Sequence, residues 1–189
     1  EIEGGYKLSG TVTTGTSKNG AMGIISASLL NKGKTTLKNV PKIEEVYRMI
    51  EVLISIGVSV KWNENDLEIE SKKINIKKIN KESAERTRSV IMLTGPLVHL
   101  YKKFSLPHSG GCKLGKRTVT PHFFALENFG ININTKTSSY EVSSTELKPA
   151  EFTLYESGDT VTENAIMAAA LIPGKTIIKF ASANYQVQD

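Results

Sequence analysis

The sequence predicts an α/β fold assembled from copies of one βαβαββ unit. Two stretches align without a gap at an offset of 141 residues, Leu30–Lys38 and Leu171–Lys179. A helix-glycine-strand junction repeats at an offset of 73 residues, at Ile56–Val58 and Phe129–Ile131. Because half of the longer offset is about 70, three copies are implied, and the third is incomplete.

The first copy opens with segments that alternate loosely in polarity. Residues 2–13 surround several glycines and predict strands. The polar turn at 14–20 leads into an apolar helix over 21–30, and Ser17 or Asn19 can cap its first turn. A helix that is apolar on all sides should be buried.

The rest of the first copy predicts one amphipathic helix and several strands. Apolar side chains recur at helical spacing over 41–56, and Gly57 is suited to end that helix. Residues 72–81 are rich in lysine and alternate, which predicts an exposed edge strand. Three further strands are expected at 33–40, 58–62 and 67–70.

The second copy follows the same order. An apolar helix is expected over 85–100, bent or broken at Gly95-Pro96. An amphipathic helix is expected over 121–129, closed by Gly130. Two strands and a Ser/Thr-rich hairpin should accompany them, at 104–106, 131–134 and 137–150.

The third copy predicts only a strand, an apolar helix and a strand, at 152–155, 162–171 and 176–180. Gathering the three apolar helices at the centre, with amphipathic helices and sheets outside, buries both kinds of surface. We therefore expect helices starting near Ala21, Ser89 and Thr162 to pack around one pseudo-threefold axis.

The composition is that of a soluble globular protein, with 39% hydrophobic and 23% charged residues. One cysteine excludes an internal disulfide and fits a reducing compartment, so a cytoplasmic location is expected. No apolar run is long enough to span a membrane, so we expect no membrane partner. A net charge of +5 favours anionic partners, either phosphorylated metabolites or nucleic acid. Sparse aromatic residues give no support to a base-stacking surface.

The loop Leu106–Arg117 carries the only cysteine, Cys112, between glycines and close to several lysines. Nearby positive charge lowers the pKa of a thiol, so the loop predicts a reactive cysteine in an anion-binding segment. Lys18 lies at the start of a predicted helix, where backbone amides also favour an anion. The alternatives are a flexible surface loop with an incidental cysteine, and an ordinary solvated lysine.

Several motifs, taken in order, resemble the enolpyruvyl transferase family, and the match covers nearly the whole chain. They are Ser17–Gly20, Asn39–Pro41, Thr87–Ser89, Gly95–Leu97, Pro107–Arg117, Thr162–Asn164 and Gly174–Ile178. The pattern Gly-Gly-Cys-x-x-Gly-x-Arg resembles the branch that acts on UDP-N-acetylglucosamine; the shikimate-pathway branch lacks the cysteine.

The resemblance implies an inside-out α/β barrel of βαβαββ repeats with pseudo-threefold symmetry. Family members have two such domains with the active site between them. Residues 1–189 would form one domain, with repeats at about 11–80, 81–150 and 151–189, the last truncated, and the second domain would be absent from this chain.

The resemblance also implies the reaction. The enolpyruvyl group of phosphoenolpyruvate moves to the 3-hydroxyl of UDP-N-acetylglucosamine and phosphate is released, the first committed step of peptidoglycan synthesis. It implies no cofactor, and the sequence has no His/Cys/Asp cluster of metal-ligand spacing. We expect this chain to be inactive alone, with the missing domain as its partner.

Residue roles follow from the same resemblance. Cys112 is the general acid toward the methylene of phosphoenolpyruvate, and Lys18 and Arg117 grip that anion. Asn19 and Arg88 contact substrate. The uridine nucleotide would be held by Thr118, Val119, Thr120 and Pro121.

Two segments depart from the family pattern. Thr120 replaces the aspartate that reads the uracil edge. The segment expected at the diphosphate contains two acids, which would repel phosphate; its residues are Glu156, Ser157, Gly158 and Asp159. Two alternatives therefore stand beside the enzyme: a non-catalytic relative that binds another nucleotide sugar or phosphorylated ligand, and a basic nucleic-acid-binding protein. The motifs favour the enzyme, and no nucleic-acid partner is expected.

Overall fold

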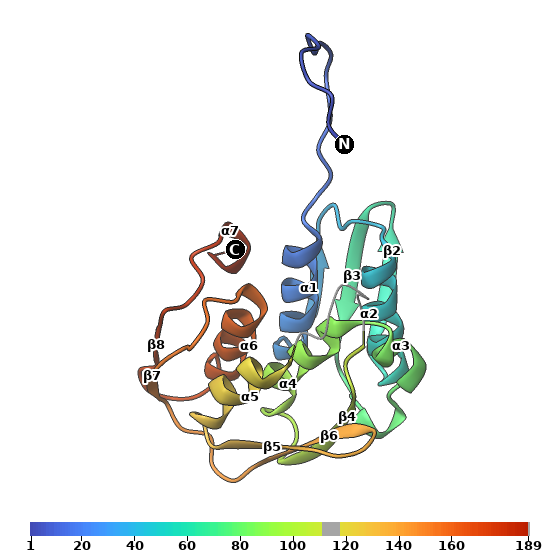
Figure 1. Ribbon diagram of the computed structural model, residues 1–189. Helices are drawn as coiled ribbons and strands as arrows, with labels where there is room; N and C mark the ends of the chain where they lie inside the picture. Colours follow the sequence, from blue (N-terminus) through green and yellow to red (C-terminus); the bar gives the residue numbers. More distant parts are fainter. Residues whose placement is uncertain (111–117, 189) are drawn as a thin grey trace.

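The centre of the molecule is a group of three helices, one from each predicted copy (Figure 1). The computed structural model describes residues 1–110 and 118–188. The three are α1 (Lys18–Ala27), the joined pair η3 (Arg88–Leu93) and α4 (Thr94–Leu97), and α6 (Asp159–Ala169). Each contacts the other two, so the predicted central packing is confirmed.

Three sheets lie around these helices (Figure 1). Two are three-stranded and antiparallel with the same topology, β1-β3-β2 and β4-β6-β5. Their strands are β1 (Lys34–Leu37), β2 (Ser59–Asn63), β3 (Asp66–Glu70), β4 (Lys103–Pro107), β5 (Ile131–Thr135) and β6 (Ser139–Ser144). The third sheet is the parallel pair β7 (Glu151–Thr153) and β8 (Ile177–Lys179).

Two helices join the sheets to the core, and only the first is amphipathic as predicted, because the second buries His122 and exposes Phe124. They are α2 (Glu44–Ser55) and α5 (Thr120–Glu127), close to the predicted ranges. Val46, Met49 and Leu53 recur on one face of α2 and are fully buried, as the helical spacing predicts. They belong to a large apolar cluster that also contains Ile25 of α1 and Ala165 of α6.

The internal repeat extends to single backbone positions. Gly57 and Gly130 both have positive φ, at 96° and 84°, shortly after α2 and α5. A Cβ on Gly57 would lie 2.8 Å from the carbonyl oxygen of Lys73, and one on Gly130 would lie 2.8 Å from that of Glu146. Both glycines are therefore required by the same turn in two copies.

The strands predicted over residues 2–13 are absent, so that prediction is wrong. This segment is exposed, projects from the rest of the molecule and turns back on itself (Figure 1). A strand needs a neighbouring strand for its backbone hydrogen bonds, and the described part of the chain places none beside this segment.

The edge strand predicted over 72–81 is also wrong. The segment contains the short helix η2 (Ile76–Lys78) and leads into α3 (Lys81–Glu85). Asn75 Oδ1 accepts a hydrogen bond from the Lys77 N–H at 3.2 Å, and Asn80 Oδ1 accepts one from the Ser83 N–H at 3.0 Å. These asparagines cap helical turns and so compete with strand pairing.

The helix predicted over 85–100 is present in altered form. It is a 3₁₀ helix in η3 and becomes an α-helix at Thr94. The break expected at Gly95-Pro96 therefore lies slightly earlier, because Pro96 falls in the first turn of α4, where its missing N–H is tolerated.

The hairpin predicted over 137–150 begins earlier than expected. It pairs β5 with β6, and the Lys136 N–H donates to the Ser139 carbonyl at 2.8 Å in the turn. A short C-terminal helix, α7 (Tyr185–Gln188), was not predicted.

Candidate active site

Three charged residues occupy equivalent positions in the three copies. Lys18 begins α1, Arg88 begins η3 and Asp159 begins α6. The first turn of a helix presents unpaired N–H groups and favours anions. The first turns of these helices therefore favour anions, although Asp159 places a negative charge at the start of α6.

Lys18 is available at the surface. Ser17 caps α1 by accepting a hydrogen bond from the Gly20 N–H at 3.1 Å, as predicted. Lys18 Nζ lies 3.2 Å from Glu45 Oε1 of α2, and both side chains are about half exposed. Such a surface ion pair is weak, so it can be exchanged for a ligand anion at little cost. Asn19 is exposed beside it.

Arg88 lies against the segment that precedes α5. Its Nη2 donates to the Thr118 carbonyl oxygen at 2.8 Å. The Thr118 Oγ1 lies 2.5 Å from Thr120 Oγ1 and accepts from the Thr120 N–H at 3.1 Å. Val119 packs on a small apolar cluster, and Pro121 is buried in the first turn of α5. The structure therefore brings Arg88 together with residues 118–121.

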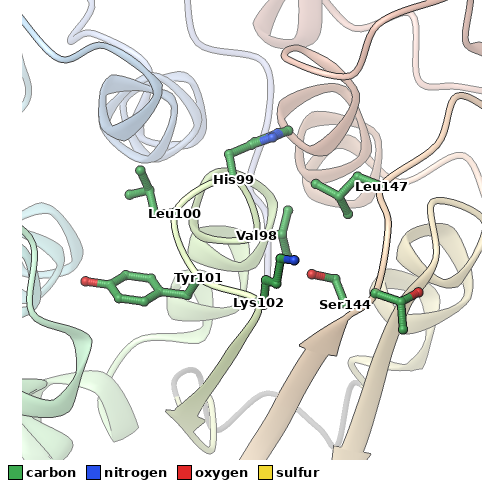
Figure 2. Close-up of a pocket in the computed structure, with 8 residues that line it drawn as sticks. Val98, His99, Leu100, Tyr101, Lys102, Ser144 and Leu147 are labelled. Carbon is green, nitrogen blue, oxygen red and sulfur yellow. The ribbon is translucent and has the colours of Figure 1, made fainter.

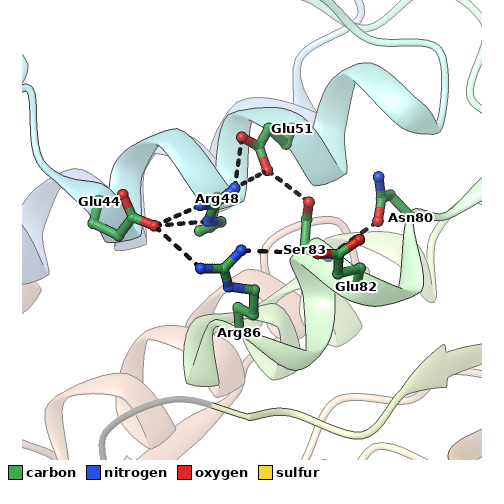
Figure 3. A network of polar contacts seen from close by, with 7 residues as sticks. All are labelled: Glu44, Arg48, Glu51, Asn80, Glu82, Ser83 and Arg86. Carbon is green, nitrogen blue, oxygen red and sulfur yellow. Dashed lines mark hydrogen bonds and ion pairs between the residues drawn. The ribbon is translucent and has the colours of Figure 1, made fainter.

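A polar network between α2 and α3 supports the segment before Arg88 (Figure 3). Arg48 bonds to Glu44 at 2.6 Å and to Glu51 at 2.8 Å. The Ser83 hydroxyl donates to Glu51 Oε2 at 2.6 Å. This hydrogen bond, followed by that from Arg48, lowers the pKa of Glu51. The network fixes α3 on α2 directly ahead of η3.

The two acids that depart from the family pattern lie in different environments. Glu156 is exposed. Asp159 instead accepts hydrogen bonds from the Ser182 hydroxyl at 2.5 Å and from Asn184 Nδ2 at 3.2 Å. Its carboxylate is thus engaged by the chain's C-terminal segment. Between them, Ser157 is exposed and Gly158 precedes α6.

The same C-terminal segment reaches α1. Gln186 Nε2 donates to Ser17 Oγ at 2.7 Å, and α7 contacts both α1 and α6. The segment therefore joins the starts of two central helices, one beside Lys18 and the other at Asp159.

Cys112 and Arg117 lie in residues 111–117, outside the described residues. The chain can be followed to Gly110, where a Cβ would lie 1.3 Å from the Glu85 carbonyl oxygen. Only glycine can occupy so close an approach. Gly110 therefore lies against Glu85, shortly before Arg88.

Three buried polar residues were not assigned roles from the sequence. His122 and Asn164 are at most 1% exposed, and Glu163 is 8% exposed. Burial, with a smaller effect of the Arg88 charge, lowers the pKa of His122 to about 3. Burial, with the Asp159 charge, raises the pKa of Glu163 to about 7. In the sequence, the signal that could have pointed to two of them is that Glu163 and Asn164 are polar residues in a predicted helix that is otherwise largely apolar.

A pocket of about 400 Å³ lies away from these residues (Figure 2). It is lined by the chain between α4 and β4 and by the residues around the end of β6: Val98, His99, Leu100, Tyr101, Lys102, Ser144, Thr145 and Leu147. It contains none of the candidate site residues.

The described residues hold neither a metal-ligand cluster nor a membrane-spanning helix. Residues 1–110 and 118–188 contain no group of three or more His, Cys, Asp or Glu side chains arranged to hold a metal ion. No helix in that part of the chain is long and apolar enough to cross a membrane.

Curated relatives match the chain along its whole length. A UDP-N-acetylglucosamine 1-carboxyvinyltransferase from Bradyrhizobium diazoefficiens is 36% identical over 189 residues, covering 100% of this chain and 44% of that protein. UDP-N-acetylglucosamine 1-carboxyvinyltransferase 1 from Legionella pneumophila is 38% identical over 192 residues, covering 100% of this chain and 38% of that protein. The chain thus spans less than half the length of these relatives.

Solved structures show the same fold. The enolpyruvyl transferase NikO from Streptomyces tendae matches with a TM-score of 0.81 at 17% identity, over 100% of this chain and 44% of that one. EPSP synthase from Acinetobacter baumannii matches with a TM-score of 0.71 at 17% identity, over 95% of this chain and 42% of that one. The predicted α/β fold is confirmed. A family model described as EPSP synthase (3-phosphoshikimate 1-carboxyvinyltransferase) matches residues 2–189, and the chain therefore belongs to this family of enolpyruvyl transferases.

Proposed function

We propose that the protein transfers the enolpyruvyl group of phosphoenolpyruvate to the 3-hydroxyl of UDP-N-acetylglucosamine and releases phosphate. The main support is that relatives bearing the name of this activity match the chain from end to end at 33–38% identity. The reaction would be the first committed step of peptidoglycan synthesis, in the cytoplasm, and so would affect cell-wall formation, cell shape and division.

In this proposal, cationic groups hold phosphoenolpyruvate while a proton reaches its methylene carbon. Lys18 and Arg117 bind the anion, and Cys112 donates the proton as the acceptor hydroxyl adds to the neighbouring carbon. Loss of phosphate and of a proton from the new methyl group then restores the double bond. The exposed position of Lys18 at the start of α1 supports this assignment.

The acceptor would lie along Arg88 and residues 118–121, with Asn19 as a further contact. The 2.8 Å hydrogen bond from Arg88 to Thr118 supports treating them as one binding surface. The Asp159 carboxylate keeps its charge, but hydrogen bonds from Ser182 and Asn184 fix its position. Glu156, Ser157 and Gly158 would then line the diphosphate.

We further propose that residues 1–189 are one domain of the enzyme, with repeats at about 11–80, 81–150 and 151–189. A second domain would close the active site. The support is that the chain covers 44% of the relative from Bradyrhizobium diazoefficiens.

The test is phosphate release from phosphoenolpyruvate by the protein expressed from its complete gene. Release should require UDP-N-acetylglucosamine and should not occur with shikimate 3-phosphate. Lys18→Ala should reduce it by at least about tenfold, while Lys32→Ala, beyond the other end of the same helix, should not. Release that depends on shikimate 3-phosphate instead would refute the proposed acceptor.

Cys112 provides a second test of the same proposal. Cys112→Ala should lower the rate by about 10²–10⁴-fold, the usual effect of losing a general acid. Cys112→Asp should retain activity, because a carboxylic acid can also donate a proton, and should no longer be alkylated by the epoxide fosfomycin. Mass spectrometry of the treated protein measures alkylation, and a wild-type Cys112 that stays unmodified with nucleotide sugar present would contradict the assignment.

A further inference from the structure

Asn164 inserts its side-chain amide into a neighbouring helix. It lies on α6 and is fully buried. Its Oδ1 accepts a hydrogen bond from the Gly95 N–H at 2.8 Å, and its Nδ2 donates to the Ile91 carbonyl oxygen at 3.2 Å. In an unbroken α-helix the Gly95 N–H would donate directly to that carbonyl. The amide therefore replaces one main-chain hydrogen bond, at the point where η3 gives way to α4.

Gly95 makes this insertion possible. A Cβ at position 95 would lie 2.6 Å from both the carbonyl oxygen and Oδ1 of Asn164, and 3.0 Å from Met167 Cβ. The Asn164 carbonyl oxygen and Met167 Cβ are held in place by the backbone of α6, so moving them aside would be costly. The interrupted helix and the asparagine are thus one structural unit.

The amide also holds His122 of α5. Asn164 Nδ2 lies 3.1 Å from His122 Nδ1. The Gly95 N–H requires the oxygen of the amide on its side, so the –NH₂ group must face both the Ile91 carbonyl and the imidazole. His122 Nδ1 is therefore the acceptor, and the ring is neutral with its proton on Nε2. Burial, which lowers the pKa of His122 to about 3, agrees with this state.

These contacts converge on the proposed acceptor site. Arg88 begins the same η3 segment that Asn164 interrupts, and His122 lies in the first turn of α5, directly after residues 118–121. Arg88 in turn bonds to Thr118. One amide on α6 thus sets η3 and α5 relative to each other.

We infer that Asn164 is a positioning residue that, through His122, holds Arg88 and residues 118–121 in register for the nucleotide-sugar acceptor. This role rests on the proposed function. Phosphoenolpyruvate, assigned to Lys18 and Arg117, should depend on it much less.

The kinetic test uses Asn164→Asp, which keeps the shape of the side chain but cannot donate to His122. In the protein expressed from its complete gene, the KM for UDP-N-acetylglucosamine should rise at least about tenfold, with the KM for phosphoenolpyruvate changed less than about twofold. Simple loss of folded protein would lower kcat alone. The matched control is Asn128→Asp, because Asn128 also donates to carbonyls through its amide but is only partly buried and directly follows α5.

A second pair of variants leaves Asn164 and its contacts with η3 unchanged. His122→Gln retains an acceptor for the amide and should keep the acceptor KM near that of wild type. His122→Leu removes the acceptor and should raise it, as Asn164→Asp does. Equal KM values for the two His122 variants would overturn the inference.

Nitrogen NMR of histidine-labelled wild-type protein tests the geometry without any activity. The His122 ring should be the neutral Nε2–H tautomer and should not titrate between pH 5 and 8. A ring that titrates near its ordinary pKa, or that carries its proton on Nδ1, would overturn the inference even if transfer activity is normal. Absent transfer activity in the wild-type protein would instead overturn the proposed function, and the positioning role with it.

Discussion

Glu163 carries a buried carboxyl group without a hydrogen-bond partner among the described residues. It is 8% exposed, and neither oxygen has a hydrogen-bond partner among the residues that the structure describes. Its carboxyl packs 3.1 Å from the position that a Cβ on Gly23 would occupy, between α6 and α1. Burial raises its pKa to about 7, so the folded protein holds a proton that the unfolded chain releases at lower pH.

The contribution of Glu163 to stability should therefore fall as the pH rises from about 4.5 to about 7, because in this range its carboxyl binds more protons in the folded state than in the unfolded state. Glu163→Gln should remove this loss and raise the free energy of unfolding at pH 8 by up to roughly 3 kcal/mol. Urea unfolding at pH 5 and pH 8 measures both values. Glu127→Gln, on an exposed part of α5, should leave the difference unchanged.

His122 should act in the opposite direction. Its pKa is lowered to about 3, so below about pH 6.5 the unfolded chain takes up a proton that the folded protein refuses. Stability should decline as the pH falls from 6.5 toward 3. In Glu163→Gln this acid-side loss should remain, and His122→Gln should reduce it. If His122→Gln loses as much stability at acid pH as the wild type does, other groups cause that loss.

The residues proposed to bind substrate could be found in the sequence, and the buried ones could not be given roles. Lys18, Arg88 and residues 118–121 stand in short motifs whose order along the chain suffices to single them out. His122, Glu163 and Asn164 depend on partners about 40 to 140 residues away, since Asn164 contacts both His122 and Ile91, and Glu163 faces Gly23. Local patterns carry no information about such partners.

At the scale of elements, the contact between α4 and α6 depends on the absence of a side chain at Gly95. Gly95→Ala would place a methyl group 2.6 Å from Asn164. We expect it to destabilise the protein by about 1–3 kcal/mol, as overpacking of a core usually does. Thermal unfolding measures the change. Gly33→Ala meets only the Asn31 side chain, at 3.4 Å, and should change the unfolding temperature little.

Helices were predicted correctly where the segment buries one face and so shows regularly spaced apolar residues. The spacing of apolar residues located α2 and α5, and glycines located their ends. Alternation alone misled at 72–81, because Asn75 and Asn80 cap helical turns within a sequence that also suits a strand. It misled at 2–13 because a strand also requires a neighbour.

At the scale of the whole molecule, the proposed two-domain enzyme predicts that residues 1–189 have no catalytic activity alone. Catalysis requires reacting groups held within a few ångströms, and part of them would come from the other domain. Phosphate release should be absent for this chain and present for the product of the complete gene. Equal specific activity of the two would show that the second domain is unnecessary. Circular dichroism is the control that the shorter chain is folded.

The placement of α1 at the centre also sets the order of events during synthesis. Its partner α6 lies more than a hundred residues later, and Gln186 returns to Ser17 across 169 residues. A nascent chain therefore displays the apolar side of α1 until α6 has left the ribosome. At about 5–20 residues per second this exposure lasts on the order of 10 s. The core that α1 begins is therefore completed only after α6 has been synthesised.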